Sequence, residues 1–273
     1  PELVEAMGYA DFDFAILDTE HTAHSYEALI HQLRAAEVVG LNPIVRPPSQ
    51  DSSLISRAFD IGAECVFVPV VETAEQARAA VLAGKYHPEG TRGICVAVKP
   101  GQYGAAFSPS YFGDQNKKTS ISIMIESVKG VENLEDIITV KGVDSIFVGP
   151  TDLSQSLGIP GQIDHPKVES AIEMIAKTAR ALKMPLGIHV YSTENRKEIE
   201  KRIEQGFQLL TVMLDTALFY KACRQISDIV KDRQNDWRFY RLNKKQISNE
   251  LNLIRFDKNV RKPIELILPN EKG

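Results

Sequence analysis

The sequence predicts an α/β protein, a (β/α)8 TIM barrel, on two observations. Short apolar runs rich in β-branched residues alternate along the chain with segments of helical periodicity. Several of these apolar runs end beside an acidic or basic residue, which is where parallel barrels carry their active sites. With 273 residues and 43% hydrophobic composition, the chain is long enough for a single barrel to use most of it.

Strands and helices are expected in strict alternation. Seven strands are expected at residues 13–18, 42–46, 64–70, 120–127, the stretch 144–154 that turns into a helix, 186–190 and 208–214. Helices are expected at residues 25–39, 52–61, 73–84, 166–183, 194–205 and 215–231, after the end of another at 2–9. The alternation indicates parallel pairing with right-handed crossovers.

Seven strands are one fewer than the fold requires, so we expect the first strand to be missing from the N-terminus. The gap would be closed by a strand preceding residue 2, by the apolar run 264–268, or by exchange between subunits. We place the barrel domain at residues 1–231 and an additional C-terminal helical tail at 232–273, where Asn, Lys, Arg and Gln become frequent. The stretch 85–118 is long for a loop, which is typical of functional or partly helical segments.

The amino-acid composition narrows the classes of molecule that the protein is expected to bind. The net charge of −4 and the even spread of basic residues argue against nucleic acid and against an anionic membrane, and favour a small molecule. Three separated cysteines, Cys65, Cys95 and Cys223, indicate neither a disulfide framework nor a thiolate zinc site. Since the sequence has no apolar run of about 18 residues and no export signal pattern, we expect a cytoplasmic protein.

The residues at the predicted strand ends are the candidates for chemistry. Two carboxylates suit Mg²⁺ or Mn²⁺, an arginine suits a carboxylate or enolate, and a histidine beside an acid suits proton transfer. No lysine stands at a strand end, so a Schiff-base mechanism has no evident nucleophile. The candidates are Asp18, Glu20, His21, Arg46, Glu126, Gly149 to Asp152, and His189.

Six motifs in order resemble those of the HpcH/HpaI aldolase family of metal-dependent class II pyruvate aldolases. They are LDTEH at 17–21, IVRPP at 44–48, FDIGAECVFVPVVETAEQA at 59–77, HPEGTRG at 87–93, MIES at 124–127 and VGPTDLSQSLG at 148–158. The resemblance covers about residues 2–218. It implies an aldolase or lyase acting on a 4-hydroxy-2-oxo acid through an enolate of pyruvate, and a homo-oligomer such as a hexamer.

The resemblance also implies roles for individual residues. Glu126 and Asp152 match the ligands of a divalent metal, Mg²⁺, Mn²⁺ or Co²⁺, and Arg46 matches the arginine that holds the keto or enolate oxygen. His21, oriented by Asp18, matches the acid/base histidine. The backbone of Gly149 and Pro150 would lie against the substrate carboxylate.

Two positions depart from the family pattern and leave the reaction open. Met124 stands where relatives commonly have glutamine, and Thr22 where they have glycine. The alternatives are an oxaloacetate decarboxylase or a citrate-type synthase that uses the same enolate site, or a non-catalytic barrel. His189 has no role in the resemblance and is either structural or a contact to the distal end of a substrate. Glu20 either faces solvent or holds Arg46.

Overall fold

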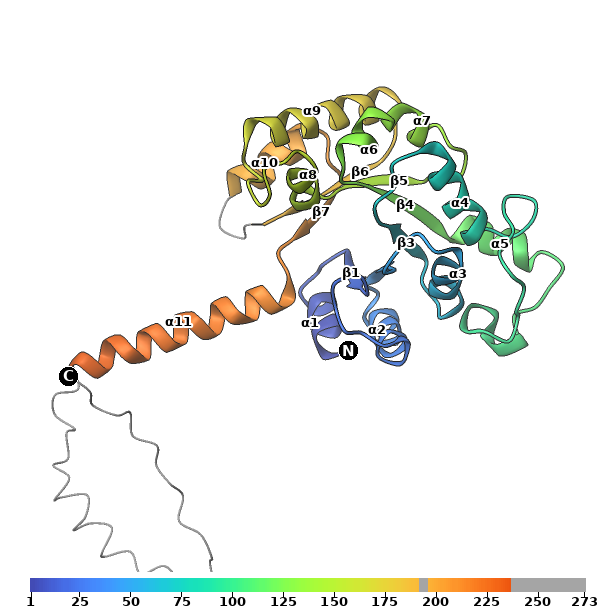
Figure 1. The fold of residues 1–273 in the computed structure, drawn as a ribbon. Coiled ribbons are helices and arrows are strands. Elements are labelled where there is room, and N and C mark those ends of the chain that lie inside the picture. Colours follow the sequence, from blue (N-terminus) through green and yellow to red (C-terminus); the bar gives the residue numbers. More distant parts are fainter. Residues whose placement is uncertain (192–195, 237–273) are drawn as a thin grey trace, which may run out of the picture. The chain divides into compact units, whose positions relative to one another are not determined.

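The computed structural model describes residues 1–191 and 196–236, and its centre is one sheet of seven parallel strands in sequence order (Figure 1). The strands are β1 Phe14–Asp18, β2 Asn42–Arg46, β3 Cys65–Val68, β4 Ser120–Ile125, β5 Ser145–Val148, β6 Leu186–Val190 and β7 Leu209–Val212. All seven predicted strands are confirmed, and the sheet curls into a nearly closed TIM-type barrel with β1 and β7 at its two edges.

Helices alternate with the strands along the chain. They are α1 Glu2–Tyr9, α2 Tyr26–Val39, α3 Ser52–Asp60, α4 Ala74–Gly84, α5 Tyr111–Lys118, α6 Val128–Glu132, α7 Leu134–Ile138, α8 Pro150–Ser156, α9 Pro166–Ala181, α10 Arg196–Glu204 and α11 Asp215–Asp236. The long stretch 85–118 is partly helical, as expected, because it contains the short 3₁₀ helix η1 Lys99–Gly104 and α5.

Helix ends follow the local sequence. The Ser25 side chain accepts a hydrogen bond from the backbone N–H of Ala28 at the start of α2, and Gly40 ends that helix with a φ of 70°. Thr73 and Gln76 form a reciprocal capping box at the start of α4. These caps fix the residue at which each helix begins after the preceding strand. They therefore also fix which residues at the strand end stay outside the helix and are accessible to a site.

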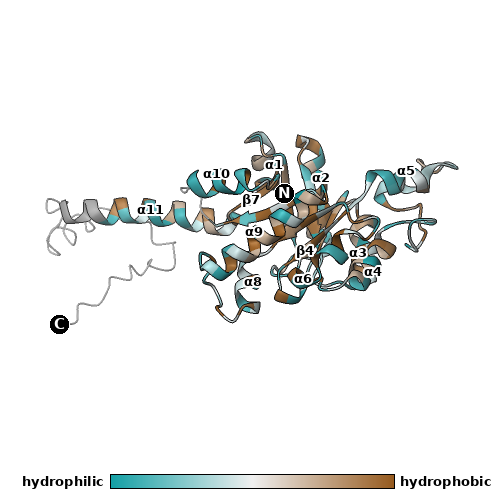
Figure 2. Cartoon of the chain, turned by 90° about the horizontal axis from the view of Figure 1, so that it is seen from above, coloured by the Kyte–Doolittle hydropathy of each residue, from teal (hydrophilic) through white to brown (hydrophobic). Residues whose placement is uncertain are grey.

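Apolar side chains form two layers, one on each face of the sheet. The larger layer lies between strands and helices, and the strand residues appear brown at the centre of Figure 2. The smaller layer lies on the inner face, where Ile44, Phe67, Met124 and Phe147 pack together and the two phenylalanine rings are 4.8 Å apart. Ile44 is two residues before the end of β2, and the other three side chains are each one residue before the end of their strands, so the four form an apolar floor beneath the C-terminal edge.

The chain divides into two compact units, Pro1–Asp215 and Thr216–Gly273. The division at residue 231 stays a prediction. The apolar run 264–268 and most of the predicted tail lie outside the described residues. Within the described part of the chain, none of the helices is both long and apolar enough to cross a membrane.

Candidate active site

The register of the sheet brings the candidate residues to one edge. Asp18 pairs with Arg46 at the ends of β1 and β2, and Ile125 pairs with Val148 at the ends of β4 and β5. Glu126 and Gly149 are the next residues along β4 and β5, so they are neighbours at this edge. Residues far apart in sequence, such as Asp18 and Arg46 at a separation of 28 positions, therefore meet where parallel barrels carry their active sites.

Arg46 is held by two acids. Its Nε and Nη2 donate to the two carboxylate oxygens of Asp18 at 2.8 and 2.7 Å, and its Nη1 lies 3.2 Å from Oε2 of Glu20. Although burial alone would raise the pKa of Asp18, the Arg46 hydrogen bonds and charge hold it below its usual value. The two hydrogen bonds to Asp18 form a planar fork that fixes the plane of the Arg46 guanidinium group. Arginine has further N–H groups with which to bind a substrate oxygen.

His21 stands at the open rim of the same cluster. Its Nε2 lies 3.6 Å from Oε2 of Glu20, and its side chain is 62% exposed. The Asp18 carboxylate accepts hydrogen bonds from Arg46 and from the backbone N–H of Glu20, and the orientation of His21 by Asp18 stays a prediction. Glu20 therefore holds Arg46 and also lies beside the imidazole, which settles the two alternatives for Glu20 in favour of the arginine contact.

Glu126 is the buried acid of the site. Its side chain lies at the end of β4, the residue is 5% exposed, and Oε1 accepts a hydrogen bond from the backbone N–H of Val70 at 2.6 Å. Oε2 lies against Gly149, where a Cβ atom would meet it at 2.7 Å. Glycine is therefore the residue that leaves room for this carboxylate beside the start of α8.

Asp152 supplies the second acid from the first turn of α8, where its side chain is exposed. Burial, together with the charges of Asp152 and Glu20, raises the pKa of Glu126 to about 7 against the opposing effects of the Val70 N–H and the Arg46 charge. The three carboxylates are therefore close enough to repel one another.

This surplus of negative charge fits a divalent cation. Carboxylate oxygens are the ligands that Mg²⁺ and Mn²⁺ prefer, and a cation would offset both the burial and the repulsion that raise the pKa of Glu126. Among residues 1–191 and 196–236, no group of three or more His, Cys, Asp or Glu side chains is placed to hold a metal. A cation at Glu126 and Asp152 would therefore depend on substrate and water for its remaining ligands.

Comparison with known proteins decides the family. The model of the HpcH/HpaI aldolase/citrate lyase family matches residues 1–222. The chain belongs to this family. A 5-keto-4-deoxy-D-glucarate aldolase of Klebsiella pneumoniae is 38% identical over 231 residues, which are 85% of this chain and 88% of the relative.

Solved structures of the HpcH/HpaI family show the same fold. A family protein from Burkholderia cenocepacia has 31% identity and a TM-score of 0.79 over 84% of this chain and 90% of its own. The citrate synthase SbnG has 30% identity and a TM-score of 0.76 over 86% and 90%. Since the family model matches most of the chain and the 38% identical relative is an aldolase, the chain is an enzyme, a carbon–carbon lyase, and not a non-catalytic barrel.

Three residues outside the predicted site shape this HpcH/HpaI site. Val70 donates its N–H to Glu126 from a backbone with φ of 53°, which is strained for a β-branched residue, and its carbonyl accepts a hydrogen bond from Gln50. Tyr191 follows β6 and bonds through its hydroxyl to Thr151. No sequence pattern indicates a positive φ at a valine. The hydrogen bond between Val70 and Glu126 could therefore not be predicted from the sequence.

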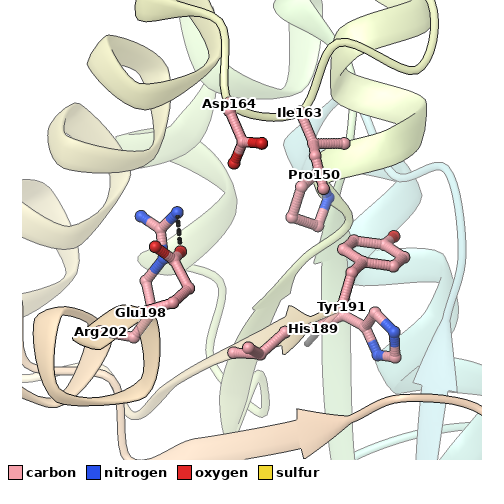
Figure 3. Close-up of a pocket in the computed structure, with 8 residues that line it drawn as sticks. Pro150, Ile163, Asp164, His189, Tyr191, Glu198 and Arg202 are labelled. Atoms are coloured by element: carbon pink, nitrogen blue, oxygen red, sulfur yellow. Dashed lines mark ion pairs between the residues drawn. The ribbon is translucent and has the colours of Figure 1, made fainter. Parts of the chain in front are cut away.

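A pocket of about 220 Å³ opens beside the end of β6 (Figure 3). Its lining comes from β6 and the residue after it, from the first residue of α8, from α10, and from the chain between α8 and α9. It is lined by Pro150, Ile163, Asp164, His189, Val190, Tyr191, Glu198 and Arg202. Pro150 and His189 connect this pocket to the strand ends described above, and Arg202 is neutralised by ion pairs with Glu169 and Glu198.

Proposed function

We propose that this enzyme is a divalent-metal-dependent aldolase that cleaves or forms a carbon–carbon bond to pyruvate in a 4-hydroxy-2-oxo acid. The observation that carries the proposal is the convergence at one edge of a buried carboxylate, Glu126, an exposed carboxylate, Asp152, and a fixed guanidinium, Arg46. Oxygen ligands for a cation and a donor for an oxyanion are what enolate chemistry requires.

Arg46 would hold the charge that develops in the reaction. When the bond between C3 and C4 breaks, its electron pair passes to the keto oxygen at C2 and gives an enolate. Because Asp18 and Glu20 fix the guanidinium plane, its remaining N–H groups are oriented before the charge appears. Binding of this kind is typically worth about 10²- to 10³-fold in kcat.

His21 would move the proton. In cleavage it takes the proton of the 4-hydroxyl, and in synthesis it returns that proton to the new alkoxide. Its exposure at the rim allows it to reach the substrate directly or through one water, and Glu20 beside it stabilises the imidazolium form. General base catalysis of this kind contributes about 10²- to 10⁴-fold.

Glu126 and Asp152 would hold the cation, which we propose is Mg²⁺, Mn²⁺ or Co²⁺. When bound, it supplies Lewis-acid polarisation of the substrate carbonyl. The Val70 N–H fixes one oxygen of Glu126, and Gly149 leaves space beside the other. The backbone of Gly149 and Pro150 at the start of α8 would lie against the substrate carboxylate.

Exchange of the methyl protons of pyruvate with solvent deuterium tests this function without knowledge of the aldehyde. We expect exchange that depends on added Mg²⁺, Mn²⁺ or Co²⁺, and cleavage of at least one 4-hydroxy-2-oxo acid. If folded, metal-loaded protein catalyses neither the exchange nor the cleavage, the proposal is wrong.

A citrate-type synthase is the second candidate, because the citrate synthase SbnG is 30% identical and shares the fold. The sequence departs from the family pattern at Met124 and Thr22, which both stand near the site. Met124 belongs to the apolar floor below it. Oxaloacetate decarboxylation would use the same residues. A panel of 2-oxo acids separates the three reactions, since tricarboxylate formation or exclusive release of carbon dioxide would count against the aldolase.

A further inference from the structure

Val70, two residues after the end of β3, is held in a backbone conformation that valine avoids. Its φ of 53° lies in the left-handed region, where the branched Cβ atom crowds the backbone. The side chain is 48% exposed, so its packing contributes little to holding this conformation. Strain of this kind persists only where the surrounding structure imposes it, and it gathers at functional sites. The hydrogen bonds of the Val70 backbone are the contacts that can impose it.

The two peptide groups that flank the Cα atom of Val70 are each bound by a side chain. The N–H on one side donates to Oε1 of Glu126 at 2.6 Å, and the carbonyl on the other side accepts from Nε2 of Gln50. Because peptide groups are planar, φ and ψ of Val70 set how these two groups are oriented relative to each other. By holding the carbonyl, Gln50 therefore helps to determine where the N–H points.

Gln50 is itself well placed to hold a neighbour. It lies in the segment between β2 and α3, directly before Asp51, whose carboxylate caps α3 by accepting a hydrogen bond from the backbone N–H of Ser53 at 2.7 Å. Two prolines at residues 47–48 restrict the backbone between Arg46 and this cap. The backbone of Gln50 is therefore anchored on both sides, and its amide has a defined reach.

We propose that Gln50 is a positioning residue that orients the carboxylate of Glu126 through the two peptide groups of Val70. This inference rests on the proposed function, in which Glu126 holds a divalent cation. With Oε1 bound to the Val70 N–H, Oε2 beside Gly149 is the oxygen left for the cation. Since Gln50 follows Arg46 by four residues, one segment places both the guanidinium that holds the enolate oxygen and the amide that acts on the metal ligand.

The alternative is that Gln50 only ties the segment after β2 to the end of β3. Gln50→Met keeps the length of the side chain and removes the N–H donor. Val70→Gly separates the two roles, because glycine adopts a positive φ without strain and needs no second hydrogen bond to hold it there. If Gln50 acts through Val70, the effect of Gln50→Met is large in the wild-type background and small in the Val70→Gly background.

The first measurement is hydrogen–deuterium exchange in metal-free protein, read by mass spectrometry on the peptide that contains Val70. We expect Gln50→Met to speed the exchange of the Val70 amide by about tenfold or more, because its N–H is no longer held against Glu126. In the Val70→Gly background the same substitution should change the exchange at this position by less than about threefold. This readout requires neither metal nor turnover.

The second measurement is the dissociation constant of Mn²⁺, obtained by calorimetry on the same four proteins. Gln50→Met should weaken Mn²⁺ binding by about tenfold, and in the Val70→Gly background by less than about threefold. Gln208→Met is the matched control, because Gln208 is exposed and precedes β7 at the opposite edge of the sheet from the site. It should leave both the exchange at Val70 and the Mn²⁺ affinity unchanged.

Unchanged exchange at Val70 in the Gln50→Met variant would overturn the positioning role, and it would contradict this inference alone if the wild type binds Mn²⁺. Equal losses of Mn²⁺ affinity in the wild-type and Val70→Gly backgrounds would also overturn it, because Gln50 would then act independently of Val70. Faster exchange that Val70→Gly suppresses, in a protein that binds no Mn²⁺, would support the positioning of Glu126 and contradict the metal site of the proposed function.

Discussion

Arg46 determines the charge balance of the site, because it is the cation that Asp18 and Glu20 share. Replacement of Arg46 by lysine keeps the charge but removes the planar fork that two carboxylates hold. We expect kcat/KM to fall by about 10²-fold or more, because an ammonium group cannot bridge Asp18 and an enolate oxygen in fixed geometry.

The same variant should bind Mn²⁺ within about threefold of wild-type affinity, since Glu126 and Asp152 are untouched. Titration calorimetry and steady-state kinetics on one preparation separate the two effects. Retained turnover would exclude Arg46 from oxyanion binding.

Glu126 makes the metal-free protein sensitive to pH. Its pKa is about 7 in the native state, chiefly through burial, against an ordinary value of 4.5, so between these values the native state keeps a proton that the unfolded chain has lost. The free energy of unfolding should therefore decrease as the pH rises from 4.5 to 7, by about 3 kcal/mol at 1.36 kcal/mol per pKa unit.

Glu126→Gln removes the titration and preserves the shape and the Val70 hydrogen bond. Urea unfolding of metal-free protein at several pH values should show a shallower decline for the variant than for the wild type. Parallel curves for the two proteins would mean that Glu126 does not titrate in this range.

The junction between β5 and α8 is the element whose backbone the site needs. Gly149 places Asp152 and the first turn of α8 beside Glu126, with Oε2 only 2.7 Å from the position of an added Cβ. Gly149→Ala should push the Glu126 carboxylate aside and weaken Mn²⁺ binding at least tenfold, which corresponds to about 1.4 kcal/mol.

Gly113→Ala is the control for this substitution, because a Cβ at Gly113 in α5 meets no atom within 4 Å. Alanine in a helix should be neutral or stabilising there. Equal Mn²⁺ affinities in the two variants, measured by calorimetry, would show that the contact between Gly149 and Glu126 is not needed.

Strands and helices were predictable because the sequence alternates between short apolar runs, typical of buried strands, and segments with the period of about 3.6 residues that helices have. The predicted ends of β2 and β6 match the structure, and with them the positions of Arg46 and His189, whereas β3 and β4 end two residues earlier than predicted, at Val68 and Ile125. Side-chain partners at those ends were not predictable. The fork of Asp18 on Arg46 and the strained Val70 depend on the path of the chain between elements, which no periodicity records.

At the scale of the whole molecule, α11 carries an apolar face that another surface would cover, either of the barrel or of another subunit. Within this unit Phe219, Ile226 and Val230 are 71%, 63% and 52% exposed and recur at spacings of seven and four, so they share one helix face. Brown and teal turns follow one another along α11 in Figure 2. Apolar residues gathered on one face of a helix are typical of surfaces that a partner covers.

We predict a homo-oligomer, and the resemblance to the HpcH/HpaI family implies a hexamer as one form. Analytical ultracentrifugation of the wild type should give an assembly, and the pair Phe219→Asp and Ile226→Asp should shift it to smaller species by placing charges on this face. A wild-type protein that sediments as a monomer at micromolar concentration would contradict the prediction.

The central claim is that Glu126 and Asp152 hold a divalent cation at the place where a 2-oxo acid binds. Anomalous scattering from a crystal soaked in Mn²⁺ and pyruvate tests it most directly. The account predicts one strong anomalous peak within coordination distance of both carboxylates, with pyruvate beside it and its keto oxygen facing Arg46. A crystal saturated with Mn²⁺ that shows no peak between Glu126 and Asp152 would contradict it.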